Sequence, residues 1–182
     1  MSGIDQSDTG DVFIKQKNLT LLNDSALTKF RKDHIGLIFQ QYNLLKNLSA
    51  LENVQIGSNL APENKEIIPI DEVLKLLEID HIADSYITEL SGGEQQRFSI
   101  ARGLVKNPDI LFCDEPTGAL DHNMSKKVLK MLQDINEKYN TTIVLITHNE
   151  NFTKIADLVI RFSDGKVASS VQNEEKISAL KL

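Results

Sequence analysis

Polar residues that suit one chemical site follow each of three apolar runs in this sequence: Gln40, the pair Asp114–Glu115, and His148. In open parallel sheets, ligands bind outside the carboxyl ends of the strands. An aspartate at such a strand end holds Mg²⁺ in nucleotide sites, and a neighbouring glutamate can polarise the attacking water. If the three runs are parallel strands, these side chains predict a site for magnesium and a nucleotide.

Each of these residues also has an ordinary structural interpretation. Acidic residues favour helix starts, so Asp114 and Glu115 would equally suit the cap of a following helix. His148 would suit a hydrogen-bonded histidine at a strand end, and Gln40 would suit a solvated side chain. Cys113, inside the second apolar run, is predicted to be a packed core thiol. Taken one at a time, these residues leave both interpretations open.

A fourth segment joins a helix-capping pattern to one that suits anion binding: Ser91, Gly92, Gly93 and Glu94. A serine with a glutamate three residues later is a capping box, which satisfies orphan amides at a helix start and needs no ligand. Paired glycines let a backbone approach an anion closely, and a helix N-terminus favours one. This segment alone does not choose between a cap and a phosphate site.

The composition sets the class of protein. The chain has 182 residues, 41% of them hydrophobic and 25% charged, which is typical of one soluble globular domain. A formal net charge of −6 argues against binding nucleic acid through a broad basic surface. The single cysteine excludes an intrachain disulfide and favours a reducing cytoplasm. No apolar run approaches the length of a membrane span, so we expect any work at a membrane to go through a partner.

The first part of the chain predicts a strand, a short helix and a second strand. Residues 11–20 alternate loosely between apolar and polar and predict a strand with one exposed face. Residues 25–33 predict a helix capped by Asp24 or Ser25. The continuous apolar run at 35–39 predicts a buried strand.

Residues 49–106 are predicted to be almost wholly helical. Two apolar faces support this: Val73, Leu76 and Leu77 after Asp71, and Phe98, Ala101 and Val105 after Ser91. The second of these helices is predicted to stop at Asn107, because the residue before a proline avoids the α region.

The pattern changes after Pro108 to alternating strands and helices. Apolar runs at 110–113 and 143–146 predict two strands. A helical pattern lies between them: Val128, Leu132, Ile135 and Tyr139. Apolar strands separated by a helix indicate a parallel sheet that is covered on both faces. A short helix and an apolar segment at 157–167 complete a predicted α/β fold.

Four segments, in this order, resemble the motifs of ABC-type ATPases: "QQYNLL" at 40–45, "LSGGEQQR" at 90–97, "ILFCDEPTGALD" at 110–121 and "LITH" at 145–148. They are similar to the Q-loop, the family signature, the Walker B motif with its catalytic glutamate and D-loop, and the switch histidine. The resemblance covers residues 1–168 and is closest over 35–148. Residues 21–54 further resemble the branch that contains macrolide exporters, antimicrobial-peptide exporters and lipoprotein-releasing transporters.

The resemblance implies an α/β fold of the P-loop NTPase (RecA-like) type, a mostly parallel sheet with an inserted helical subdomain. It implies one partial domain, in which residues 1–40 and 107–168 are the remainder of the α/β core. Residues 41–106 would be the helical subdomain with the signature, and residues 169–182 a tail. The N-terminal strands, the phosphate loop and the first helix of the family would be lacking.

The resemblance also implies roles in binding ATP and Mg²⁺. Asp114 and Gln40 would hold the magnesium ion, Glu115 would activate the attacking water, and His148 would contact the γ-phosphate. A second set would face the nucleotide of another ATPase domain in a homo- or heterodimer: Ser91, Gly92, Gly93, Glu94 and Asp121. ATP hydrolysis would drive a membrane-spanning permease that exports or extracts peptide, macrolide or lipoprotein-like cargo. The chain would be cytoplasmic, peripheral on the inner face of the membrane, and bind no nucleic acid.

The sequence departs from the family in one motif. Family members cradle the phosphates of ATP with G-x-x-x-x-G-K-[ST], and no such segment occurs in the 182 residues. Lys166 follows a glycine, but Val167 comes next, and Ile160 stands where the first glycine would be. We therefore expect a truncated gene product, an incomplete gene model or a deliberately shortened chain that begins just past the phosphate loop, with Met1 near the end of the following helix. Loss of a central strand would leave an unpaired sheet edge and weak or no ATP binding.

Two other functions remain open from the sequence. A non-catalytic subunit would offer its signature to a complete partner and hold no nucleotide itself. A nucleic-acid-handling member of the superfamily, for DNA repair or translation, would usually carry a long coiled-coil insertion, an extra domain or a basic arm. None of these is visible in the sequence.

Overall fold

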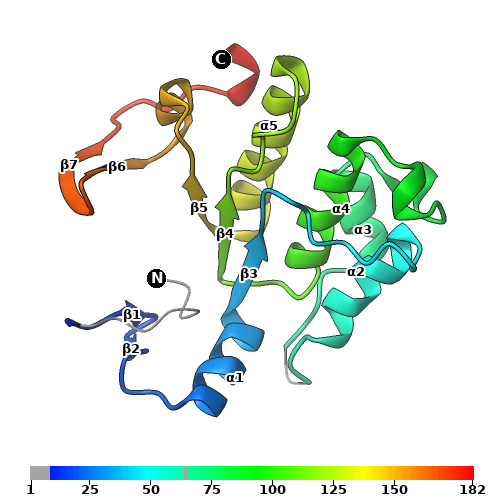
Figure 1. The fold of residues 1–182 in the computed structure, drawn as a ribbon, viewed down its shortest axis with the longest axis horizontal. Coiled ribbons are helices and arrows are strands. Elements are labelled where there is room, and N and C mark those ends of the chain that lie inside the picture. The colour runs from blue at the N-terminus through cyan, green and yellow to red at the C-terminus, as the bar shows by residue number, and fades with distance from the viewer. Residues whose placement is uncertain (1–8, 64) are drawn as a thin grey trace.

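A three-stranded parallel sheet lies at the centre of the computed structural model, which describes residues 9–63 and 65–182 (Figure 1). Its strands stand in the order β3 (Ile35–Ile38), β4 (Ile110–Asp114) and β5 (Thr142–Ile146). Both pairings are parallel, so the carboxyl ends of all three strands lie at the same edge of the sheet. The predicted α/β fold with a parallel sheet is confirmed.

Alternate residues of β4 face two different apolar layers. Leu111 and Cys113 are fully buried against α4 (Gly92–Leu104) and α5 (His122–Tyr139). Phe112 packs on the opposite side, in a smaller cluster with Phe30 of α1 (Asp24–His34). Burial raises the pKa of the Cys113 thiol, in agreement with the predicted core position. The sheet is therefore covered on both faces, by a large apolar cluster on the side of α4 and α5 and by a small one on the side of α1.

The N-terminal segment differs from its prediction. Instead of one strand over 11–20, the structure has a tight antiparallel hairpin, β1 (Phe13–Ile14) and β2 (Lys17–Asn18). The chain reverses at Lys15 and Gln16, whose φ angles are 49° and 63°, which is the backbone of a two-residue hairpin turn. The cap of α1 is also one residue earlier than predicted, because the Asn23 side chain accepts the N–H of Ala26 at 2.9 Å.

The predicted helical region is confirmed only in part, because residues 60–63, 65–69, 77–79 and 83–86 lie outside its helices. It contains three α-helices and two 3₁₀-helices: α2 (Ala50–Asn59), α3 (Ile70–Leu76), η1 (Asp80–Ile82), η2 (Ile87–Glu89) and α4. Helix α3 begins one residue before the predicted Asp71 and buries Leu74 more fully than Leu76. Helix α4 ends at Leu104, three residues before Asn107. The residues predicted to form its buried face are fully buried.

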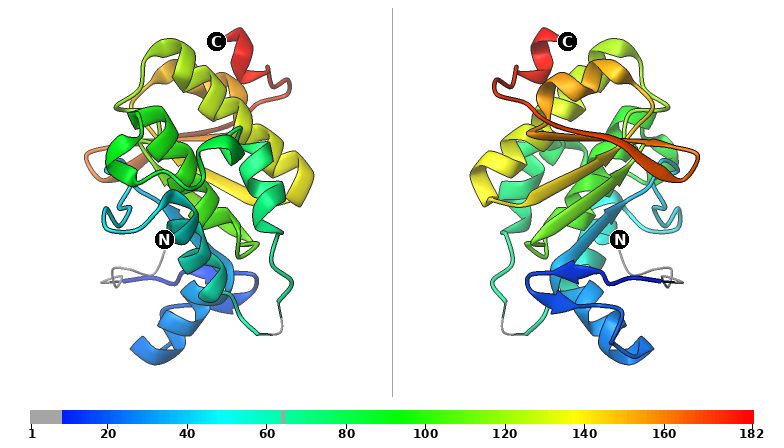
Figure 2. Two further views of the ribbon diagram at one scale, coloured as in Figure 1. Left: turned by 90° about the vertical axis from the view of Figure 1, so that its right-hand side faces the viewer. Right: turned by 90° about the vertical axis from the view of Figure 1, so that its left-hand side faces the viewer.

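The C-terminal part of the chain forms a hairpin beside the sheet. The hairpin consists of β6 (Leu158–Ser163) and β7 (Lys166–Gln172). Two 3₁₀-helices flank it in the chain, η3 (Glu150–Ile155) before it and η4 (Ala179–Lys181) after it. Figure 2 shows this hairpin near the C-terminal helices and the N-terminal hairpin beside α1 at the other end of the molecule. Residues 169–182, set apart above as a tail, hold half of β7 and the buried Ala179, whose N–H binds Gln133 of α5 at 2.8 Å.

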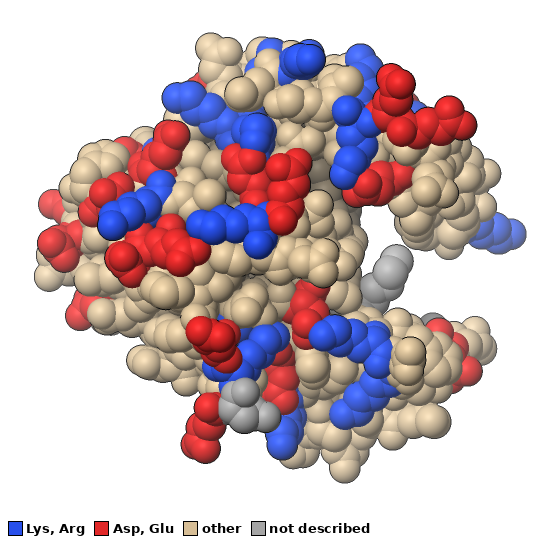
Figure 3. All heavy atoms as spheres, turned by 180° about the vertical axis from the view of Figure 1, so that it is seen from behind, with Lys and Arg blue, Asp and Glu red and all other residues tan. Residues whose placement is uncertain are grey.

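Strand β5 has an unpaired edge within the described part of the chain, because its ladder there joins it only to β4. Its side chains are correspondingly less buried than those of β3 and β4. Apolar side chains of the neighbouring hairpin are also exposed: Leu158, Ile160, Phe162, Val167 and Val171. Figure 3 shows a notch between the two hairpins, on a face where charges of both signs are mixed. No helix in the described residues is long and apolar enough to cross a membrane.

The crossing of α2 and α4 depends on Gly57. A Cβ atom at this position would lie 2.2 Å from the main-chain oxygen of Arg102 and 2.9 Å from Cγ1 of Val105. Because the nearest atom belongs to the backbone of α4, the two helices would have to move apart. Gly57 therefore sets the distance between α2 and the helix that begins at Ser91.

We expect Gly57→Ala to lower the free energy of unfolding by about 1–3 kcal/mol, the usual cost of overpacking a core. Gln55→Ala, on the exposed side of the same helix, serves as the matched control and should change stability by less than about 0.5 kcal/mol. Urea unfolding followed by circular dichroism measures both variants. Equal stability of the two variants would contradict the close crossing.

Candidate functional site

The carboxyl ends of β3, β4 and β5 bring the three predicted polar groups to one edge of the sheet. The structure places Gln40 two residues after β3, Asp114 as the last residue of β4, and His148 two residues after β5. The order of the strands puts the acidic pair in the middle. The parallel topology alone is therefore enough to gather these residues, which are far apart in the sequence.

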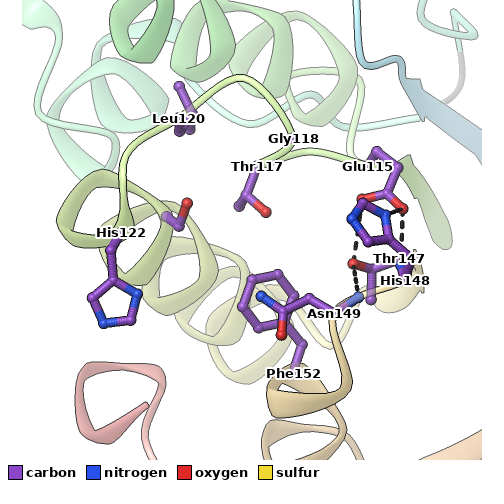
Figure 4. Close-up of a pocket in the computed structure, with 10 residues that line it drawn as sticks. Glu115, Thr117, Gly118, Leu120, His122, Thr147, His148, Asn149 and Phe152 are labelled. Carbon is purple, nitrogen blue, oxygen red and sulfur yellow. Dashed lines mark hydrogen bonds and ion pairs between the residues drawn. The ribbon is translucent and has the colours of Figure 1, made fainter.

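Glu115 is held in place by the turn that follows β5 (Figure 4). Its φ angle is 44°, a left-handed value that is uncommon for a residue other than glycine. Its Oε1 accepts the His148 N–H at 2.9 Å and lies 2.7 Å from the His148 Nδ1. Its Oε2 accepts the Thr147 hydroxyl at 3.3 Å. The carboxylate is thus oriented by its neighbours, whereas 87% of the His148 side chain is exposed and accessible to a ligand.

A pocket of about 230 Å³ opens beside Glu115 and His148. Its walls come from the two segments that follow β4 and β5, within residues 115–125 and 147–152. Figure 4 shows the Thr117 side chain pointing into it and His122 on the far wall. Pockets for whole small molecules usually measure about 300–1,000 Å³. This pocket therefore suits one end of a nucleotide and a water better than a complete nucleotide.

The residues predicted to hold magnesium fit that ion. The Asp114 side chain is exposed, and no hydrogen bond or ion pair with another described residue engages its carboxylate. The Gln40 Nε2 lies 3.1 Å from the point that a Cβ on Gly118 would occupy, so this carboxamide reaches the segment after β4. The described residues contain no group of three or more His, Cys, Asp or Glu arranged around a metal. Mg²⁺ needs no such group, because one or two carboxylates, waters and substrate phosphates usually hold it.

The start of α4 is the predicted capping box. The Ser91 hydroxyl accepts the Glu94 N–H at 3.4 Å, and Glu94 Oε2 accepts the Ser91 N–H at 2.7 Å. The Ser91 hydroxyl also donates to Glu94 Oε2 at 2.7 Å, and this hydrogen bond, together with that from the Ser91 N–H, lowers the pKa of the Glu94 carboxyl. The box leaves the N–H groups of Gly92 and Gly93 without a partner inside the helix, as in any first turn. The cap and an anion site are therefore compatible at this helix end.

Side chains from two other predicted segments flank this helix start. The hydroxyl of Tyr42 lies 3.1 Å from the point that a Cβ on Gly92 would occupy. For Gly93 the nearest atoms belong to the Met124 side chain, at 2.9 to 3.2 Å. Met124 is in the first turn of α5, where its N–H binds the N-cap residue Asp121 at 3.0 Å. The helix start thus lies against the segment that follows Gln40 and against the first turn of α5.

The structure separates the predicted residues into two groups. Glu115 and His148 line the pocket, and Gln40 and Asp114 lie at the same edge of the sheet without lining it. Residues 91–94 lie at the start of α4 and do not line the pocket either. The Asp121 carboxylate is engaged in capping α5 and is otherwise exposed. Two groups on one chain, each with free donors or acceptors, are what a site shared between two chains requires.

Sequence reasoning missed three residues that shape these groups. Thr147 lies inside the motif at 145–148, and Met124 lies three residues after the motif at 110–121. The sequence showed where they stand in the chain but did not predict their contacts. Arg102, which binds the main chain near Gln40, carries no sequence signal at all because its contacts span 59 and 60 residues.

Comparison with known families gives one matching model, described as "ABC transporter", over residues 1–118. The chain is 47% identical over 173 residues to a putative ABC transporter ATP-binding protein of Mycoplasma genitalium, covering 95% of this chain and 37% of that protein. It is 37% identical over 169 residues to the lipoprotein-releasing system ATP-binding protein LolD of Cytophaga hutchinsonii, covering 92% and 77%. The chain therefore spans little more than a third of the Mycoplasma relative.

Among solved structures, the chain resembles an ATP-binding cassette of Methanocaldococcus jannaschii with a TM-score of 0.81 and 35% identity. The match covers 94% of this chain and 76% of the other. That structure is described as a dimer in a post-hydrolysis state, bound to ADP and phosphate.

Proposed function

This chain belongs to the ABC transporter family of ATP-binding proteins, and we propose that it supplies nucleotide-binding and hydrolytic residues to a membrane transporter. One observation carries the proposal: the Glu115 carboxylate is fixed against His148 at the edge of the sheet where Gln40 and Asp114 also lie. Fixed acceptors at the carboxyl ends of parallel strands are the arrangement that nucleotide sites of this fold use.

We infer a division of labour among the four residues. Asp114 and Gln40 would hold Mg²⁺, which neutralises developing charge on the phosphates when it is bound. Glu115 accepts a hydrogen bond from the attacking water and orients it. The exposed His148 imidazole donates a hydrogen bond to the γ-phosphoryl oxygen. Phosphoryl transfer depends mainly on positioning and charge stabilisation, so residues held by neighbours are well suited to it.

We also propose that the start of α4 acts on a nucleotide held by a second ATPase domain. Ser91, Gly92 and Gly93 would direct their donors at its γ-phosphate, with Glu94 holding the cap and Asp121 lying at the seam. The position of these residues at the start of α4 and not at the sheet edge supports this division, and a related cassette is dimeric. The partner is a homodimeric copy or a different ATPase domain.

The 182 residues contain no phosphate loop, so we expect them alone to bind ATP no more tightly than about 1 mM, near the weak end of measurable affinities. Isothermal titration calorimetry of the 182-residue chain with MgATP measures this. Micromolar, magnesium-dependent binding would overturn the expectation.

The unpaired edge of β5 further predicts that the 182-residue chain associates with itself, which size-exclusion chromatography with light scattering would measure.

For the wider protein we propose a permease partner that holds the chain at the cytoplasmic face of the membrane. The cargo that we propose is a peptide, a macrolide or a lipoprotein-like molecule, and the relatedness to the lipoprotein-releasing protein LolD supports the last of these. Co-purification tests the proposal. Co-purification of this chain with a membrane permease, in a complex whose ATPase activity depends on this chain, would support it. A stable complex with a complete ATPase, in which removal of Glu115 has no effect, would favour the non-catalytic subunit instead.

A further inference from the structure

The loop that carries Gln40 adopts a backbone conformation that most residues other than glycine avoid. Tyr42 and Asn43 have φ angles of 60° and 50°, and both are therefore left-handed. The Tyr42 N–H binds the Phe39 carbonyl at 3.1 Å, and the Asn43 N–H binds the Gln41 carbonyl at 2.6 Å. Two consecutive strained residues persist only where the surroundings hold them.

Arg102 of α4 holds both strained residues at once. Its Nη2 donates to the Tyr42 carbonyl at 3.0 Å and its Nη1 to the Asn43 carbonyl at 2.5 Å. Ser99, one turn earlier on α4, donates its hydroxyl to the same Tyr42 carbonyl at 3.0 Å. A guanidinium is a rigid fork of donors and matches two adjacent acceptors, which a lysine ammonium does not.

The charge of Arg102 has no acidic partner in the described chain. Burial lowers the pKa of its guanidinium, and every ion pair within the described residues involves other side chains. A partly buried cation is costly unless its donors are satisfied. Here the main-chain oxygens of the loop satisfy them, so the cation and the strained loop stabilise each other.

This loop touches both groups of predicted site residues. Gln40, two residues before Tyr42, reaches Gly118 in the segment that follows Glu115. The hydroxyl of Tyr42 lies against Gly92 at the start of α4. Any shift of the loop along α4 would therefore change the position of Gln40 relative to the Glu115 segment.

We propose that Arg102 is a positioning residue that locks the Gln40–Asn43 loop onto α4, so that Gln40 and the Ser91–Gly93 helix start move as one unit. The lock itself follows from the contacts above. Its consequence for ATP hydrolysis rests on the proposed function, because that function assigns Gln40 to the magnesium ion.

The lock is tested by tryptic cleavage after Lys46, an exposed residue just beyond the loop. Arg102→Met keeps the bulk of the side chain and removes its donors, and we expect about tenfold faster cleavage there, as for loss of charge-assisted hydrogen bonds. Arg102→Lys, which keeps the charge but not the fork, should fall between. Cleavage after Lys126 in α5 is the internal reference, and Ile100→Val, buried on α4, controls for a general loss of stability.

The consequence is tested by ATP hydrolysis in the transporter assembled from this chain and its partners. We expect Arg102→Met to lower kcat with little change in KM for ATP, and Arg102→Lys to restore part of kcat. Unchanged cleavage after Lys46 would overturn the lock. Faster cleavage with unchanged kcat would overturn its role in positioning Gln40. If the assembled wild-type protein hydrolyses no ATP, the proposed function fails, and the cleavage experiment still decides on the lock.

Discussion

Glu115→Gln, in the transporter assembled from this chain and its partners, should lower the rate of ATP hydrolysis by about 10²–10³-fold and leave nucleotide binding intact. General-base assistance is usually worth about 10²–10⁴-fold. The amide keeps the size of the carboxylate and an oxygen that accepts the His148 N–H, so the turn after β5 should remain folded. The negative charge and the basicity that orient the water are lost, together with the acceptor that Oε2 offers to the Thr147 hydroxyl.

Three measurements make this result decisive. Hydrolysis is followed by phosphate release, nucleotide affinity by a fluorescent ATP analogue, and folding by the midpoint of thermal unfolding. Asp164→Asn serves as the control. It removes the same charge as Glu115→Gln, but at an exposed turn between β6 and β7, away from the carboxyl ends of the parallel strands. Normal hydrolysis by the Glu115 variant, or an equal loss in the control, would remove Glu115 from the catalytic role.

The parallel sheet was predictable because continuous apolar runs identify buried strands. Each run ends within one residue of the end of its strand, so the position of Asp114 at a strand end followed from the pattern alone. The turn at Lys15 and Gln16 was not predictable, since neither residue is the glycine or asparagine that usually marks left-handed backbone. The exposed edge of β5 was expected from the missing motif rather than from the apolar run, which predicts burial.

The candidate site was predictable to the extent that topology alone decides it. Parallel strands in adjacent order must bring Gln40, Glu115 and His148 to one edge. Contacts between side chains distant in sequence, such as that of Arg102 with the Tyr42 carbonyl, depend on how α4 crosses the sheet. No local sequence pattern determines that crossing, so the spacing of residues in the sequence cannot predict such contacts.

Gly93→Ala should lower hydrolysis at the partner's nucleotide by about 10²-fold, the order of loss that a displacement of about 1 Å produces in a catalytic arrangement. The protein itself offers only weak resistance to the added methyl group. The nearest atoms are Cγ, Sδ and Cε of Met124, at 2.9 to 3.2 Å, and they belong to a flexible side chain rather than to backbone. A strict need for glycine here would therefore come from a ligand that approaches the helix start.

A second substitution separates the two explanations for Gly93. Met124→Ala removes the three atoms nearest to the added methyl group, so Gly93→Ala combined with Met124→Ala should regain any stability lost by the single variant. If glycine is needed for the approach of a phosphate, hydrolysis stays low in this double variant, while Met124→Ala alone retains activity. Recovery of hydrolysis together with stability would instead show that Gly93 serves only the packing of α4 on α5. Because the capping box of Ser91 and Glu94 is unchanged in all three variants, neither outcome can be attributed to loss of the cap.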